Sequence, residues 1–234
     1  MRSRRTGRPS IDHPAHEATR PGRSGRHPQH VRLRHRLKRP NQKISVVRFP
    51  PLSRPLNPNL PYKIAVLCYL YDAEDRVLLL HRLKSPNAGM YSPIGGKLDV
   101  ETGEGPHACA VREIEEEAGI SLRDEEIRLT GIVSEQAYEG ETHWLIFLFE
   151  VTRPIDHGEI AEMNFDEGQL EWVPVDEVAK HGIPETDKRI MWPLVQSHRH
   201  GGLFMVHINC TDGKLDWVVQ ESSRGVHQPP APNV

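Results

Sequence analysis

The sequence predicts an α/β domain of mixed α+β character, in which a mixed β-sheet packs between helices, with a disordered basic tail in front of it. Apolar β-prone segments alternate irregularly with segments of helical period, which favours a mixed sheet with helices on both faces. No apolar run reaches the roughly 18–20 residues of a membrane span, which excludes an integral membrane protein. The net charge is −2, but residues 1–43 carry +11 and the rest −13, an asymmetry typical of a tail on a domain.

The first 58 residues are predicted to be a disordered tail and linker, rich in Arg, Pro and His. Residues 1–43 contain 11 Arg and 2 Lys against Asp12 and Glu17, and too few apolar side chains to offset the entropy of ordering them. We interpret them as a dispensable extension or the result of a start site assigned too far upstream. A transit peptide and a nucleic-acid-binding arm are the alternatives. The folded domain is expected over 59–225, with a frayed end over 226–234.

The domain is expected to begin with two apolar, β-prone strands, Lys63–Tyr71 and Arg76–Arg82. Asp72–Asp75 supplies turn residues between them, so the two strands are predicted to pair as a hairpin. A loop is expected over Leu83–Pro93, and Gly95-Gly96 opens a second loop that leads to a helix.

That helix is predicted to begin at Pro106, directly after Gly105, and to end before Gly119. An apolar stripe with a spacing of four residues faces the core and consists of Ala110, Ile114 and Ala118. Three carboxylates share an adjoining face at i, i+3 and i+4: Glu113, Glu116 and Glu117.

The remaining elements follow from the same periodicities. Strands are expected over Ile127–Ser134, Trp144–Val151 and Leu170–Val173, and helices over Val175–Lys180 and Asp187–Ser197. A last hairpin is expected from Leu203–Asn209 and Leu215–Gln220, about the turn Thr211-Asp212-Gly213.

Three glutamates on one helix face repel one another, by roughly 0.2–0.5 kcal/mol for each i,i+4 pair. A solvated acidic face tolerates this cost, but a hard divalent cation offsets it, because Mg²⁺ takes oxygen ligands and shares them with substrate phosphates. The pattern around the glutamates favours the second interpretation. Glu104 precedes Arg112 by eight residues, and R-E-I-E-E-E-A-G-I follows from Arg112 to Ile120.

This segment resembles the Nudix box of the Nudix hydrolases, G-x5-E-x7-R-E-U-x-E-E-x-G-U, in which U is aliphatic. The matching residues are Gly96, Glu104, Arg112, Glu113, Ile114, Glu116, Glu117, Gly119 and Ile120. Seven residues separate Gly96 from Glu104 where the family has five, and the extra pair falls in the loop Leu98–Gly103, where insertions are best tolerated. The resemblance covers roughly residues 61–221 and implies the Nudix fold.

The resemblance implies a role for each residue of the box. Metal ions, Mg²⁺ or Mn²⁺ in its place, would be held by Glu113, Glu116 and Glu117, with Glu104 as a further ligand, either directly or through water. Arg112 would orient Glu116, four residues ahead, or form an ordinary surface ion pair. Gly95 and Gly96 would let the backbone approach phosphate. Lys97 would neutralise phosphate charge or simply be exposed.

The implied reaction is attack of water on a phosphorus of a nucleoside diphosphate linked to another group X. A general base is needed as well. The first candidate is Glu116 and the second is Glu167, which on its own is more often a solvated turn residue. A catalytically inactive module that binds a nucleotide is the alternative from a different class, although the box glutamates are intact.

The segment after Trp172 resembles the branch that cleaves oxidised purine nucleoside triphosphates such as 8-oxo-dGTP. By that resemblance Asp187 or Glu185 would read the purine edge; the alternative is that they cap the next helix. Trp192 and Phe204 would supply flat walls. Tyr138 lies where the dinucleoside-polyphosphate hydrolases of the family carry Tyr, which favours a second substrate class.

The expected partner is a small nucleotide, with no membrane partner and with nucleic acid only through the basic tail. Three widely spaced cysteines without a CxxC pair argue against a disulfide scaffold or a structural zinc site, and fit a reducing cytoplasm. The oligomeric state is not given by the sequence.

Overall fold

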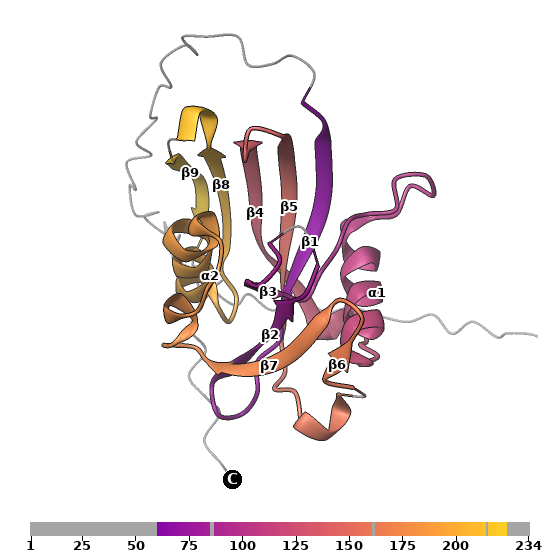
Figure 1. Cartoon of the computed structure of the whole chain (residues 1–234). Coiled ribbons are helices and arrows are strands. Elements are labelled where there is room, and N and C mark those ends of the chain that lie inside the picture. Colours follow the sequence, from indigo (N-terminus) through magenta and orange to yellow (C-terminus); the bar gives the residue numbers. More distant parts are fainter. Residues whose placement is uncertain (1–59, 85–86, 161, 214, 224–234) are drawn as a thin grey trace, which may run out of the picture. The chain divides into compact units, whose positions relative to one another are not determined.

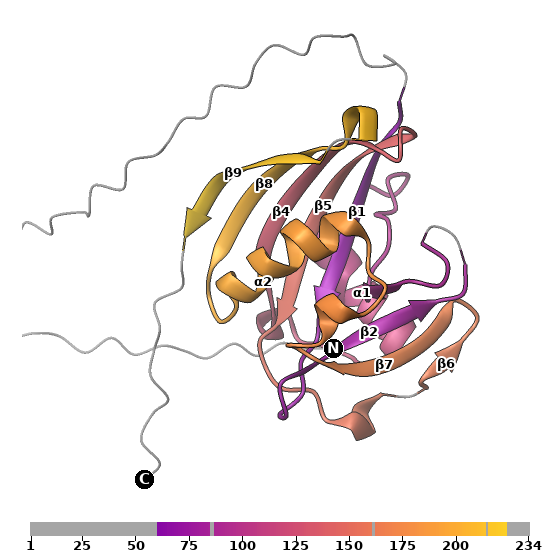
Figure 2. The same ribbon diagram turned by 60° about the vertical axis from the view of Figure 1, so that its left-hand side comes forward.

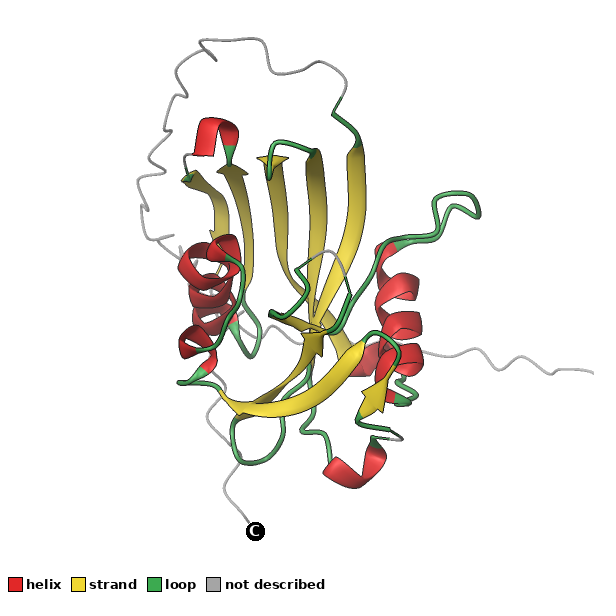
Figure 3. Cartoon of the chain, viewed as in Figure 1, coloured by secondary structure: helices red, strands yellow, loops and turns green. Residues whose placement is uncertain are grey.

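The computed structural model describes residues 60–84, 87–160, 162–213 and 215–223; the predicted tail and linker (1–58) and the predicted frayed end (226–234) lie outside them. The strands are β1 (Tyr62–Tyr69), β2 (Arg76–Arg82), β3 (Tyr91–Pro93), β4 (Ile127–Tyr138), β5 (Thr142–Val151), β6 (Asn164–Phe165), β7 (Gly168–Pro174), β8 (Leu203–Asn209) and β9 (Asp216–Ser223). The helices are α1 (Pro106–Ala118) and α2 (Trp192–His198), with short 3₁₀ turns in the connections (Figures 1 and 3). No described helix is long and apolar enough to cross a membrane.

A five-stranded sheet forms the centre of the domain, in the order β1-β5-β4-β8-β9. The pairs β1–β5 and β4–β8 are parallel, whereas β4–β5 and β8–β9 are antiparallel, so the sheet is mixed. The predicted mixed sheet between helices is therefore confirmed, as is the last hairpin, β8–β9.

The predicted hairpin between the first two strands is wrong. β2 belongs to a second, four-stranded antiparallel sheet of order β3-β2-β7-β6, and β1 pairs with β5 instead. Only the residues beside the turn meet, through a bridge between Tyr71 and Val77 and a 2.9 Å bond from the Leu78 amide to the Leu70 carbonyl. A turn reverses the chain locally but does not specify strand partners, and strands that are apolar on both faces leave several partners open.

The two helices α1 and α2 cover opposite faces of the central sheet (Figures 1 and 2). An apolar cluster lies beneath each helix. Successive side chains of β1 alternate between them, with Cys68 on the side of α1 and Tyr69 on the side of α2, where its ring lies 6.0 Å from that of Trp192. β2 alternates in the same way. Continuous apolar runs in these strands therefore reflect burial on both faces.

The local sequence explains the ends of both helices. Gly105 and Pro106 begin α1, and Gly119 ends it in the left-handed conformation (φ 71°), with its amide donating to the Glu115 carbonyl at 2.9 Å. The segment predicted as one helix over Asp187–Ser197 instead starts with a π-helical turn, Asp187–Met191, and continues as α2. Such turns are rare and are frequent at functional sites, which draws attention to the side chains that this turn presents.

Candidate active site

The three box glutamates project from α1 around the guanidinium group of Arg112. The Nη1 atom of Arg112 donates to Glu113 Oε1 at 2.8 Å and to Glu116 Oε2 at 3.0 Å. Its Nε and Nη2 atoms bond both oxygens of Glu104, at 2.8 and 2.9 Å. Arg112 thus fixes two of the box carboxylates, while Glu117 receives only a 3.3 Å bond from the Gly95 amide.

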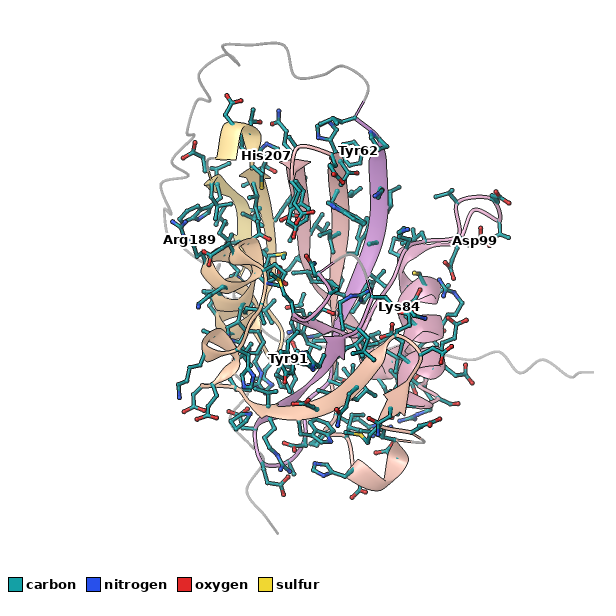
Figure 4. The ribbon with its side chains drawn as sticks, in the orientation of Figure 1. Tyr62, Lys84, Tyr91, Asp99, Arg189 and His207 are labelled. Carbon is teal, nitrogen blue, oxygen red and sulfur yellow. The ribbon has the colours of Figure 1, made fainter. Side chains whose placement is uncertain are left out.

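Glu104 has a different position from the other three glutamates. Both of its oxygens are held by Arg112, and Oε2 also accepts the Asp99 amide at 2.9 Å, in the loop before α1 where Figure 4 labels Asp99. The bond from Arg112 lowers the pKa of Glu104 to about 2. Glu104 is outside the lining of the cavity described below, so the structure assigns it contacts that position Arg112.

Gly95 and Gly96 allow the chain to pass closely between β1 and α1. A Cβ on Gly96 would collide with the carboxylate of Glu113, and a Cβ on Gly95 would collide with the Val66 carbonyl. Gly95 also has a φ of +152°, which side chains rarely permit. The two glycines therefore form the cradle into which the Glu113 side chain fits.

A cavity of about 510 Å³ opens beside this cradle. Its lining includes the box residues Glu113, Glu116 and Glu117, together with the cationic side chains of Arg82 and Lys97. The charge of Arg82 acts on the pKa of Glu117, and Arg112 donates to the Lys97 carbonyl at 3.3 Å, so anionic and cationic groups lie together in this part of the cavity, which we call the box end.

A second part of the lining comes from β4, β5 and the segment before α2, and β1 and β3 contribute further residues. The second part includes Glu135, Tyr138, Trp144, Ile146, Asp187 and Met191, and within it the charges of Glu135 and Asp187 act on the pKa of Tyr138. This part of the cavity combines flat or apolar side chains with two carboxyl groups, a composition suited to an aromatic ligand with a polar edge.

The box end fits a hard divalent cation. Burial, followed by the charge of Glu113, raises the pKa of Glu117 to about 8, and burial also raises the pKa of Glu113. The raised pKa values show that the negative charge of these carboxylates is not balanced by nearby positive charge. The carboxylates offer only oxygen atoms as ligands, which are the ligands that Mg²⁺ prefers. Glu113, Glu116 and Glu117 are the residues that would hold it.

The structure brings most of the other predicted site residues to the cavity. Lys97, Glu167, Tyr138 and Asp187 line it, the last at the start of the π-helical turn. Glu167 lies on the turn between β6 and β7, which is tied to the end of β2 by a 2.8 Å bond from the Leu83 amide to the Glu167 carbonyl.

The remaining predicted site residues lie elsewhere. Glu185 is exposed outside the cavity lining, and Trp192 and Phe204 are buried in the apolar cluster beneath α2. The structure therefore supports neither ring as a wall of this cavity.

Several cavity residues were missed by the sequence analysis, among them Arg82, Asn87, Glu135 and Thr186. Arg82 was interpreted only as the end of a strand, and Glu135 lies in β4 but directly after the predicted strand Ile127–Ser134, so neither was considered as a site residue. A charged residue within an otherwise apolar alternating strand was the available signal for Glu135. Asn87 and Thr186 carry no comparable signal.

A second acidic group, which we call the Asp72 cluster, consists of Asp72, Glu74 and His157. Their potential ligand atoms lie within 4.8 Å of one another, the one such group of three found in the described residues. Arg76 already contacts every member, at 2.6 Å from Asp72 Oδ2, 3.0 Å from Glu74 Oε2 and 3.0 Å from His157 Nε2. The His157 ring also stacks on Trp172, with centroids 4.8 Å apart. The cation of this cluster is thus a protein side chain.

Comparisons with known proteins agree with this geometry. A model of the NUDIX domain matches residues 61–192. Proteins from two Mycobacterium tuberculosis strains, named "Putative 8-oxo-dGTP diphosphatase 3", are 37% identical over 111 residues, which cover 46% of this chain and 48% of theirs. The chain therefore spans about half the length of the curated relatives it matches. The crystal structure of a mutator MutT protein from Bacillus halodurans is 28% identical and covers 67% of this chain and 97% of its own, with a TM-score of 0.53.

Proposed function

Since this chain belongs to the Nudix hydrolase family, we propose that it is a Mg²⁺-dependent pyrophosphohydrolase of nucleoside diphosphates linked to a further group. The substrate we propose is a nucleoside triphosphate with an oxidised purine, such as 8-oxo-dGTP, which would be converted to the monophosphate and pyrophosphate. The observation that carries the proposal is one cavity with a carboxylate-and-cation end and an aromatic, carboxyl-bearing end. The name of the Mycobacterium tuberculosis relatives supports the same substrate.

The first end suits a polyphosphate. Arg82 and Lys97 supply positive charge to phosphoryl oxygens, and Gly96 leaves the backbone open beside Glu113. Bound Mg²⁺ supplies a Lewis acid that polarises phosphoryl oxygens and lowers the pKa of water. The role of Arg112 is to keep Glu113 and Glu116 in place through its two Nη1 bonds.

Hydrolysis forms a bond from a water oxygen to phosphorus and breaks one phosphoanhydride P–O bond. A carboxylate must take the proton that the water loses. Glu116 and Glu167 both line the cavity, and Glu116 remains our first candidate because Arg112 orients it. Glu167 would act as the general base from the turn between β6 and β7.

A substrate panel tests this proposal. The full chain is incubated with Mg²⁺ and 8-oxo-dGTP, dGTP, ADP-ribose or a diadenosine polyphosphate, and the release of pyrophosphate or orthophosphate is measured. Pyrophosphate release that is fastest from 8-oxo-dGTP is the expected result. Absence of Mg²⁺-dependent hydrolysis of every substrate would contradict the proposed activity.

A dinucleoside polyphosphate is the second candidate substrate, favoured by one observation. Tyr138 lines the cavity, and its hydroxyl donates to Asn87 Oδ1 at 3.2 Å. An aromatic ring at this position offers a stacking surface for a second base. A preference for the diadenosine polyphosphate in the same panel, reduced in Tyr138→Ala, would replace our first substrate by this one.

A further inference from the structure

The carboxyl group of Glu135 is anomalous in its surroundings. Glu135 is only 3% exposed, and within the described residues its Oε1 atom has no hydrogen-bond partner. Along β4 it pairs with Trp144 of β5 and Ile208 of β8, so its neighbours across the sheet are apolar or aromatic. This carboxyl oxygen makes no hydrogen bond that would stabilise the fold, and a buried polar atom without a partner lowers the free energy of unfolding.

The position of Glu135 relates it to the cavity. Glu135 belongs to the lining, as do Trp144, Thr186 and Asp187, and it interacts with Asp187 and Thr186, whereas the box residue Glu117 interacts with Glu113, Glu167 and Arg82. A ligand whose phosphates reach Arg82 and Lys97 would therefore bring its non-phosphate part to Glu135. An unpartnered group at a cavity wall is satisfied when a ligand supplies the missing hydrogen bond.

The protonation state decides what Glu135 offers to such a ligand. Burial, followed by the charge of Asp187, raises the pKa of Glu135 to about 8, against an opposing hydrogen bond from Thr186. The side chain is then mainly protonated at neutral pH, with one O–H donor and one carbonyl acceptor. Burial raises the pKa of the neighbouring Asp187 to about 7, below that of Glu135, so Asp187 is the carboxyl group that ionises first and accepts hydrogen bonds.

Building on the proposed function, we propose that Glu135 is a specificity-determining residue whose neutral carboxyl group donates its O–H to a carbonyl oxygen of the substrate's nucleobase. Asp187 accepts N–H groups from the same edge. A base edge that carries a carbonyl oxygen beside N–H groups, as in an oxopurine, satisfies both side chains. An edge without a carbonyl oxygen leaves the Glu135 donor to pair with a ring nitrogen or with nothing.

Two substitutions separate a neutral donor from a charged acceptor. Glu135→Gln keeps a donor and a carbonyl in nearly the same volume, whereas Glu135→Met removes both and suits the apolar wall. Thr130→Val is the matched control, because Thr130 is a buried residue of the same strand with an unpartnered hydroxyl, outside the cavity lining. All are made in the full chain.

The readout is a ratio of kcat/KM values, for 8-oxo-dGTP over 2-deoxyribose 5-triphosphate, which lacks a base. In Glu135→Met we expect this ratio to fall about 10- to 100-fold, the size of one lost buried hydrogen bond, with Tm equal to or above that of the parent. Glu135→Gln is expected to keep the ratio within about threefold, since its amide replaces the donor. Thr130→Val is expected to leave the ratio unchanged.

Three outcomes would overturn the inference. An unchanged ratio in Glu135→Met removes Glu135 from base recognition. An equal fall in Glu135→Gln and Glu135→Met shows that the charged form acts. A fall in Tm with parallel losses on both substrates assigns Glu135 a structural role.

A failure of the proposed function can be distinguished from a failure of the inference about Glu135. If the parent hydrolyses no nucleoside triphosphate, the affinities of parent and Glu135→Met for 8-oxo-dGTP are compared by calorimetry in EDTA. Weaker binding by Glu135→Met would then support the inference without the activity. Equal affinity, or no binding by either protein, would overturn it.

Discussion

The Asp72 cluster and the box carboxylates Glu113, Glu116 and Glu117 are both acidic groups built around one arginine, but they differ in how much charge remains uncompensated. In the Asp72 cluster, Arg76 contacts all three members. In the box, Arg112 contacts Glu113 and Glu116, and two of its nitrogen atoms bond Glu104. Within the described residues, Glu117 accepts a single long hydrogen bond, from the Gly95 amide.

This difference shows that closeness of ligand atoms is a poor guide to a cation site. The Asp72 cluster has the tighter arrangement of potential ligands, yet its negative charge is already paired. The pKa values agree with this difference in paired charge. Burial tends to raise the pKa of Asp72, but the bonds from His157 and Arg76 outweigh it and lower the pKa, whereas the pKa of Glu117 is raised to about 8. Uncompensated charge, rather than proximity, is therefore our reason for proposing the box and not the Asp72 cluster as the cation site.

Neutralising one box glutamate should give the largest effect. Glu116→Gln keeps the size of the side chain but removes a charge and a candidate base, so we expect kcat to fall about 10²- to 10⁴-fold with the fold retained. Glu74→Gln in the Asp72 cluster is the matched control, since Glu74 is 66% exposed there and outside the cavity lining. Turnover at saturating Mg²⁺ is measured for both. Near-normal turnover of Glu116→Gln would remove this residue from the mechanism.

Replacing the box arginine should have the next largest effect. Arg112→Lys keeps the charge, but a lysine cannot bond Glu104, Glu113 and Glu116 together. We expect kcat to fall about 10- to 100-fold, as is typical when a group that orients metal ligands is lost. Steady-state kinetics of Arg112→Lys and Arg76→Lys provide the comparison. Equal activities in the two variants would mean that Arg112 is no more than a surface ion pair.

Disrupting the Asp72 cluster should cost stability and spare catalysis. Asp72→Ala leaves the Glu74 and Arg76 amides without their acceptor, and we expect the free energy of unfolding to fall by about 1–3 kcal/mol. Urea unfolding measures the loss, and Mg²⁺ titration of activity is expected to give the parent's half-saturating concentration. A shifted Mg²⁺ dependence would assign the cluster a part in metal binding.

The last prediction concerns the pH dependence of stability and not catalysis, and here the two kinds of carboxyl group should act in opposite directions. The lowered pKa of Asp72 contributes stability above about pH 4 that is lost as pH falls, because the folded state binds the proton less readily than the unfolded state. The pKa of Glu135 is raised from 4.5 to about 8, so its contribution is lost as pH rises from about 4.5 to 8. Asp187, with a pKa of about 7, adds to the second slope.

Unfolding free energies in EDTA at pH 3.5, 5, 7 and 8.5 check these slopes. Relative to the parent, Asp72→Asn should flatten the acid limb and Glu135→Gln the limb between pH 5 and 8. Parallel curves for the parent and both variants would show that neither carboxyl group has a shifted pKa in the folded state.

The sequence by itself determined the elements that depend on neighbouring residues. Gly105-Pro106 and Gly119 set the ends of α1, and a spacing of three and four residues placed the box glutamates on one face of it. The position of Arg112 four residues before Glu116 likewise predicted their contact, which is observed at 3.0 Å. Local signals suffice here because helix periodicity and helix capping operate within a few residues.

Only the tertiary structure decided the features that join distant segments. It placed β1 beside β5 rather than β2, because strand pairing depends on which apolar faces meet across the whole domain. It brought Glu135 of β4 together with Asp187, and placed Trp192 in the buried cluster beneath α2. The pKa of each cavity carboxyl group depends on burial and on charges contributed by other elements, so no local pattern in the chain could reveal it.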